Sequence, residues 1–246
     1  DTAAVAFALR HDRVVVPMLP VDGPPQVRVF RRGDADKYML LLFSSARAGV
    51  AVTPLNYRLS PDGLRELIDR LPTPLVIADA EYIDVVAGAG KQVISSDEFV
   101  ESARTAEPAA EFPDPDDVAV VLFTSGTTSR PKAVELTHNN LTSYVTGAVE
   151  FASASDEDAA LICVPPYHIA GVSAALSNLY AGRKMVYLSK FDPQQWIQLV
   201  AEEGITSATV VPTMLDRIVS ALERTPTELL TLRNLAYGGS KVALPL

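Results

Sequence analysis

The sequence has few of the side chains that form covalent or metal cross-links. Its 246 residues include one cysteine and three histidines. A disulfide within the chain is therefore excluded, and because these residues show no metal-ligand spacing, we expect no structural zinc site. The cysteine, Cys163, lies in an apolar segment at 161–164, where a buried and unreactive thiol is expected.

The sequence also lacks long apolar runs and an excess of positive charge. No run approaches the roughly 18 apolar residues of a membrane-spanning helix, and the first residues lack the basic leader of a signal peptide. With 21 Lys and Arg against 30 Asp and Glu, the formal net charge is −9, which disfavours a broad nucleic-acid surface. We expect a cytoplasmic globular protein that neither crosses a membrane nor binds nucleic acid.

The chain does contain an alternation of short β-rich segments with segments of helical period. After the entry signal Ser60-Pro61, one helix face is predicted to be formed by Leu64, Leu67, Ile68 and Leu71. Strands are expected at 27–30, 50–55, 75–78, 118–123, 160–164, 185–188, 208–211 and 232–237. Because parallel strands need helical crossovers, this alternation predicts the α/β class, with largely parallel sheets covered by helices.

Three further helices have recognisable starts or faces. One is expected at 36–48, one after Thr137 as an N-cap, and one at the cap-and-proline pair Asp192-Pro193. In the last of these, the apolar face that begins at Trp196 is expected to pack in the core rather than against a cofactor.

An acidic, proline-rich segment interrupts the alternation before the middle of the chain. It is interpreted either as a linker between two lobes or as a surface loop within one domain. In the first interpretation, residues 1–107 form one α/β lobe, 108–117 the linker and 118–246 a second α/β lobe.

A hydroxyl-rich loop directly after the apolar segment 118–123 carries the clearest chemical signal. Its hydroxyl groups can donate to phosphate oxygens, Gly126 permits a turn that points backbone N–H groups inward, and Lys132 adds a positive charge. A polar surface turn is the alternative, since the same residue types are common in turns. The spacing fits neither a Walker A loop nor a dinucleotide fingerprint. The residues expected to bind phosphate are Thr124, Ser125, Gly126, Thr127, Thr128 and Lys132.

This loop resembles the phosphate-binding motif of the adenylate-forming superfamily, which includes acyl-CoA synthetases, luciferases and adenylation domains. Segments 47–59, 165–171 and 237–240 are similar to other motifs of the superfamily and occur in the same order. The chain is most similar to acyl-CoA synthetases and fatty acyl-AMP ligases. Two positions depart from the usual motif, because Ser129 and Ala133 stand where glycine is common.

The later motifs of the superfamily and its C-terminal domain, which carries a catalytic lysine, do not occur in the sequence. The resemblance therefore predicts an incomplete large N-terminal domain, inactive by itself.

The resemblance also assigns roles to residues outside the loop. It implies that His168 borders the acyl and adenylate site as the catalytic residue. Without the resemblance, a hydrogen-bonded structural histidine would be the favoured interpretation. It further implies that Gly238, Gly239 and Ser240 line the adenine pocket, where a glycine pair could otherwise be a simple turn. The pair Tyr167-His168 favours an acid without an α-amine, since peptide-synthetase domains tend to carry an aspartate there.

Together these features imply an ATP-dependent ligase. A carboxylic acid, with a fatty acid favoured, would be activated by ATP and Mg²⁺ to an acyl-adenylate and passed to a thiol of CoA or an acyl-carrier protein. The alternative is a non-catalytic remnant or interaction module of the same family, motivated by Ser129, Ala133 and the missing motifs.

Overall fold

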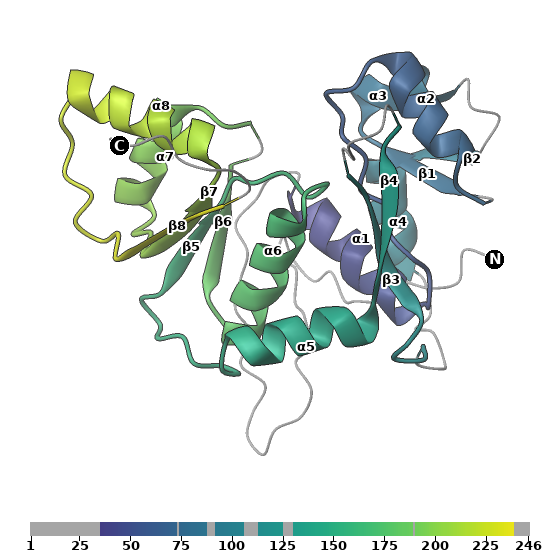
Figure 1. Cartoon of the computed structure of the whole chain (residues 1–246), viewed down its shortest axis with the longest axis horizontal. Helices are drawn as coiled ribbons and strands as arrows, with labels where there is room; N and C mark the ends of the chain where they lie inside the picture. Colours follow the sequence, from purple (N-terminus) through teal and green to yellow (C-terminus); the bar gives the residue numbers. More distant parts are fainter. Residues whose placement is uncertain are drawn as a thin grey trace. The chain divides into compact units, whose positions relative to one another are not determined.

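The computed structural model describes residues 35–72, 74–87, 92–105, 113–124, 130–188 and 190–238 (Figure 1). The elements are α1 (Ala35–Arg47), α2 (Pro61–Asp69), β1 (Leu75–Ala78), α3 (Ala80–Val86), β2 (Gln92–Ser95), α4 (Ser96–Thr105), β3 (Val118–Thr124), β4 (Lys132–Thr137), α5 (His138–Ala148), β5 (Ala159–Ile162), α6 (Ile169–Ala181), β6 (Lys184–Tyr187), α7 (Pro193–Glu202), β7 (Ser207–Val210), α8 (Pro212–Arg224) and β8 (Asn234–Tyr237). These residues form two compact units, whose described parts run from Lys37 to His138 and from Asn139 to Gly238.

In the first unit, helices cover both faces of the parallel pair β1-β2. Val76 pairs with Val93 and packs toward Ile68 of α2, whereas the next pair, Ile77 with Ile94, packs toward α1 and α4. Successive side chains of a strand point to opposite faces, so four neighbouring apolar residues serve two separate clusters. This explains why strand 75–78, found at its predicted bounds, is an uninterrupted apolar segment.

Residues close to its start determine where helix α2 begins. The Ser60 side chain accepts a hydrogen bond from the Gly63 N–H at 3.2 Å and caps the helix, with Pro61 as its first residue. The predicted apolar face is confirmed at Leu64, Leu67 and Ile68, which are all buried. Leu71, also predicted on this face, lies after the end of the helix and is only partly buried.

Strand β3 lies between two different partners. It pairs antiparallel with β4, and on its other side Val52 forms a single parallel bridge to Val120. The predicted strand 50–55 was wrong in extent, because Val52 alone forms that bridge. Pro54 has no N–H to donate, which limits a longer ladder.

The second unit contains a four-stranded parallel sheet in the order β6-β5-β7-β8. Helices α7 and α8 pack together on one face, and α6 lies on the other face (Figure 1). The predicted start of α7 is confirmed, since the Asp192 side chain accepts from the Gln195 N–H at 3.0 Å. Trp196 is fully buried in the core between α7, α8 and the sheet, as predicted for this helix face.

The predicted α/β class with helix-covered, largely parallel sheets is confirmed. Four predicted strands of the second unit occur within two residues of their expected bounds, whereas strand 27–30 lies outside the described residues. The structure groups β3 and β4 with the first unit, although the sequence-based division expects 118–246 as a second lobe. Where the lobes of the protein divide stays a prediction.

Cys163 directly follows β5 and is buried, as expected. Its thiol donates a hydrogen bond to the Thr209 carbonyl at 3.4 Å. Burial raises the pKa of the Cys163 thiol to about 12, so the thiol stays protonated and unreactive at neutral pH.

Candidate functional site

The antiparallel pair β3-β4 brings the two ends of the predicted phosphate loop together. Thr124, the last residue of β3, pairs in register with Lys132, the first residue of β4. The Thr124 hydroxyl lies 3.5 Å from the Lys132 carbonyl, and both residues are exposed. The two ends of the segment between the strands therefore lie next to each other. They carry the hydroxyl group of Thr124 and the ammonium group of Lys132.

The middle of the loop lies outside the described residues. This applies to the predicted phosphate ligands Ser125, Gly126, Thr127 and Thr128 and to the departure at Ser129. Their roles remain predictions.

Ala133, the other departure from the superfamily motif, fits its position without strain. It lies in β4 opposite Phe123. The only residue other than glycine that has a positive φ within the described ranges is Ala152, so Ala133 adopts an ordinary extended conformation. Nothing in the backbone at this position requires a glycine.

In the second unit, His168 lies at the start of α6. Its backbone is extended, with φ −104° and ψ 144°, and its carbonyl accepts from the Gly171 N–H at 2.9 Å, which begins the helix. The imidazole is exposed and its ring centroid lies 4.6 Å from that of the buried Tyr167. The buried tyrosine thus holds the base of a turn from which the histidine projects toward solvent.

Gly171 allows the turn at residues 165–168 to pack closely against the first turn of α6. A Cβ atom at this position would lie 2.4 Å from the Pro165 carbonyl oxygen, 2.8 Å from its carbon and 3.0 Å from the Pro166 Cα. All three atoms belong to the backbone, so no side-chain rotation relieves the overlap. Only glycine allows the chain 165–168 to lie this close to the first turn of α6.

His168 and Gly238 both lie at the end of the parallel sheet formed by the carboxyl ends of its strands. The chain leaves β5 toward β6 on one side, and it leaves β7 toward β8 on the other side. The direction of the connections therefore reverses between β5 and β7, and in open α/β sheets ligands bind outside the carboxyl ends of the strands at such a point. His168 follows β5, and Gly238 follows β8 at the same edge.

Gly238 leaves space at the end of β8. Its N–H donates to the Val210 carbonyl at 3.3 Å, and a Cβ atom built on it would meet nothing within 4 Å. Gly238 is exposed, and none of the described residues occupies the place of a side chain there. The neighbouring candidates Gly239 and Ser240 lie outside the described residues.

Sequence reasoning did not identify Arg70, after helix α2, as a neighbour of Pro131 in the predicted phosphate loop. Arg70, the residue after the helix, donates a hydrogen bond to the Pro131 carbonyl at 2.8 Å. The two residues are 61 positions apart, and no local pattern in the sequence indicates such a contact.

Within the described ranges, no group of three or more His, Cys, Asp or Glu side chains could hold a metal ion. None of the helices in these ranges is long and apolar enough to cross a membrane.

Comparison with known proteins relates this chain to ligases. The fatty acid–acyl-carrier-protein ligase ScoC of Streptomyces coeruleorubidus is 29% identical over 227 residues, which cover 85% of this chain and 43% of that protein. A feruloyl-CoA synthase of an Amycolatopsis species is 34% identical over 214 residues, with coverage of 85% and 43%. The chain thus spans less than half the length of these relatives.

The fold and a family model agree with these similarities. The structure is similar to that of ATP-bound MatB from Rhodopseudomonas palustris, with a TM-score of 0.68 and 28% identity, over 83% of this chain and 43% of that one. The model of the AMP-binding enzyme family matches residues 35–246. The chain belongs to the AMP-binding enzyme family, within the adenylate-forming superfamily.

Proposed function

We propose that the protein activates a carboxylic acid with ATP to an acyl-adenylate and then transfers the acyl group to a thiol of CoA or an acyl-carrier protein. The observation that carries this proposal is the pairing of Thr124 with Lys132, which brings both ends of a hydroxyl-rich loop together in a chain of this family. The relatives act on different acids, a fatty acid in one case and ferulate in another.

The first step is a displacement at the α-phosphorus of ATP. A carboxylate oxygen forms a bond to this phosphorus, the bond to the bridging oxygen of the β-phosphate breaks, and pyrophosphate leaves. The task of the protein is positioning and charge stabilisation. Lys132 and the hydroxyl of Thr124 would contact the β- and γ-phosphates, where the leaving group gains negative charge, together with Ser125, Gly126, Thr127 and Thr128.

In the second step, the thiol sulfur attacks the carbonyl carbon of the acyl-adenylate, and AMP leaves with the oxygen that joined the two groups. His168 would border the acyl group and orient the carboxylate, because it is exposed after β5 at the edge where the connections reverse. The adenine would lie near Gly238, whose missing side chain leaves open space, with Gly239 and Ser240 beside it.

Mg²⁺ bound to ATP would neutralise charge on the phosphates.

We favour a fatty acid as the substrate, because the chain resembles fatty acyl ligases. Tyr167 and His168, at positions where peptide-synthetase domains tend to carry an aspartate, favour an acid without an α-amine. A non-catalytic module of the same family is the alternative. One argument for this alternative was the alanine at a position where glycine is common. That argument is weak, because Ala133 lies in a regular strand without a positive φ.

Acid-dependent exchange of labelled pyrophosphate into ATP by the intact protein tests the proposal. With a panel of fatty, aromatic and small carboxylic acids, we expect at least one acid to support exchange. His168→Ala should lower kcat/KM for that acid by about tenfold to a hundredfold and leave the KM for ATP nearly unchanged, because misplacing a reacting group costs rate rather than nucleotide binding.

The matched control is Tyr144→Ala, an exposed aromatic residue of α5 in the same unit, which should behave like the wild type. If ATP binds but no acid supports exchange, the ligase assignment is wrong and the non-catalytic alternative gains support.

A further inference from the structure

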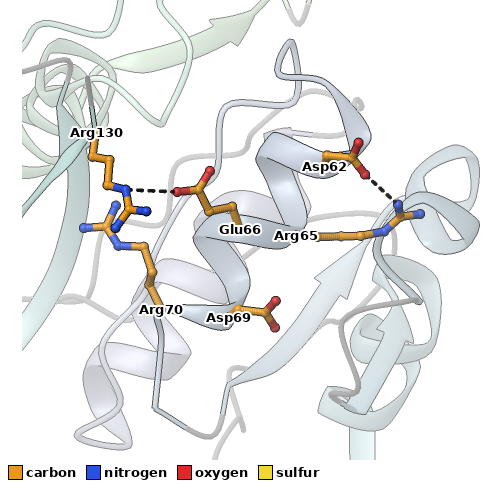
Figure 2. A pocket seen from close by; sticks show the side chains of 6 residues that line it. All are labelled: Asp62, Arg65, Glu66, Asp69, Arg70 and Arg130. Atoms are coloured by element: carbon orange, nitrogen blue, oxygen red, sulfur yellow. Dashed lines mark hydrogen bonds and ion pairs between the residues drawn. The ribbon is translucent and has the colours of Figure 1, made fainter.

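An open pocket of about 490 Å³ lies beside the phosphate loop in the first unit. Figure 2 shows Arg130, which precedes β4, next to Glu66 of α2 and next to Arg70. The pocket is lined by three acidic and three basic side chains, namely Asp62, Glu66, Asp69, Arg65, Arg70 and Arg130. The charges balance in number, so the pocket is not a general anion site.

One side chain of this pocket contacts residues next to both ends of the loop. The Arg70 Nη1 atom donates to the Pro131 carbonyl at 2.8 Å, and the guanidinium carbon lies 4.9 Å from the centroid of the Phe123 ring. Phe123 precedes Thr124 at the end of β3, and Pro131 precedes Lys132 at the start of β4. A single guanidinium group therefore contacts the chain immediately before each end of the loop.

These two contacts suit arginine in particular. A planar guanidinium can donate a hydrogen bond along its edge while its face lies on an aromatic ring, and a lysine ammonium cannot do both in the same way. The group also lies at the C-terminal end of α2, where the helix dipole favours positive charge.

Helix α2 holds Arg70 in a defined place. The helix is capped by Ser60 and buried through Leu67 and Ile68, so the residue that follows it projects from a fixed element. A second contact also joins α2 to the chain before β4. The Arg130 Nε atom lies 3.9 Å from a carboxylate oxygen of Glu66 (Figure 2). This pair is well exposed and contributes little by itself.

We propose that Arg70 is a positioning residue for nucleotide binding. By holding Phe123 and Pro131 against α2, it fixes the end of the β3-β4 hairpin, which carries Thr124 and Lys132, in the position that lets them contact the phosphates of ATP. The inference rests on the proposed function and adds to it a residue outside the motifs of the family, which acts through the loop and does not itself touch the substrate.

Steady-state exchange kinetics of the intact Arg70→Met protein test the inference. Methionine keeps the apolar length of the side chain but cannot donate to Pro131, so we expect the KM for ATP to rise by about tenfold. We expect the KM for the acid to stay within about twofold of the wild type, because the acid is not bound by this loop. Arg70→Lys, which keeps a charged donor, should recover part of the loss.

The matched control is Arg65→Met, on the same helix and in the same pocket. Arg65 pairs with Asp62 of its own helix at 3.2 Å, so its loss should leave the KM for ATP unchanged. If Arg70→Met has the same KM for ATP as Arg65→Met in an active enzyme, the positioning role is overturned. If kcat and both KM values change together with a lowered Tm, Arg70 acts only on stability and the inference is also overturned. An inactive wild type would instead refute the proposed function on which the inference rests.

Discussion

Gly171→Ala should lower both the stability of the protein and its rate of acid-dependent exchange. The new Cβ would lie 2.4 Å from the Pro165 carbonyl oxygen, so either the first turn of α6 or the chain 165–168 must move. Such overpacking costs about 1–3 kcal/mol. Because His168 lies within the displaced segment, kcat/KM for the acid should fall by about a hundredfold, as expected for a small misplacement of a reacting group.

Gly147→Ala provides a matched control for this substitution. Gly147 lies near the end of α5, and a Cβ atom there would meet nothing within 4 Å. Alanine is the better helix former by up to about 1 kcal/mol, so the control should be neutral or slightly stabilising. Thermal unfolding and exchange kinetics of the two variants make the comparison. A Gly171→Ala protein with the Tm and the activity of the wild type would show that the close approach to Pro165 is not required.

Lys132→Ala should abolish most of the nucleotide-dependent activity without affecting the fold. The side chain is exposed at the first position of β4, so its removal leaves the core intact. If its charge stabilises the departing pyrophosphate, kcat/KM for ATP should fall by about a hundredfold or more. Exchange kinetics with varied ATP measure this loss, and thermal unfolding should show an unchanged Tm.

Two companion variants separate charge from position at this site. Lys132→Arg keeps the positive charge and should retain part of the activity, although its geometry differs. Glu135→Ala removes an exposed charge of the opposite sign from the same strand and should leave kcat/KM for ATP within about threefold of the wild type. Equal activity of Lys132→Ala and the wild type would contradict the assignment of this loop as the phosphate site.

The parts of the fold that were predictable are those with local causes. The caps Ser60 and Asp192 and the strand 75–78 follow from side chains within a few residues of each element, and all occur as predicted. Strand β2 (Gln92–Ser95) was missed, because only half of its residues are apolar and its burial depends on pairing with β1.

The sequence motif names Thr124 and Lys132 as candidate phosphate ligands, and that role stays a prediction. Their pairing across the hairpin could not be predicted, because it is a property of the strand register. The contact of Arg70 with Pro131 joins residues 61 positions apart, and the need for glycine at Gly171 comes from the backbone of Pro165 packing on α6. Such requirements arise only when distant or folded-back segments meet, so no periodicity or spacing indicates them.

The most direct test of the proposed chemistry follows the oxygen atoms of the acid. The intact protein is incubated with ATP, an acceptor thiol and a carboxylic acid labelled in its carboxyl group with the heavy oxygen isotope, and the products are weighed by mass spectrometry. Attack of the carboxylate on the α-phosphorus predicts that one labelled oxygen appears in AMP and none in inorganic phosphate. Label in inorganic phosphate with ADP as the nucleotide product, or thioester formation without any label in AMP, would contradict activation through an acyl-adenylate.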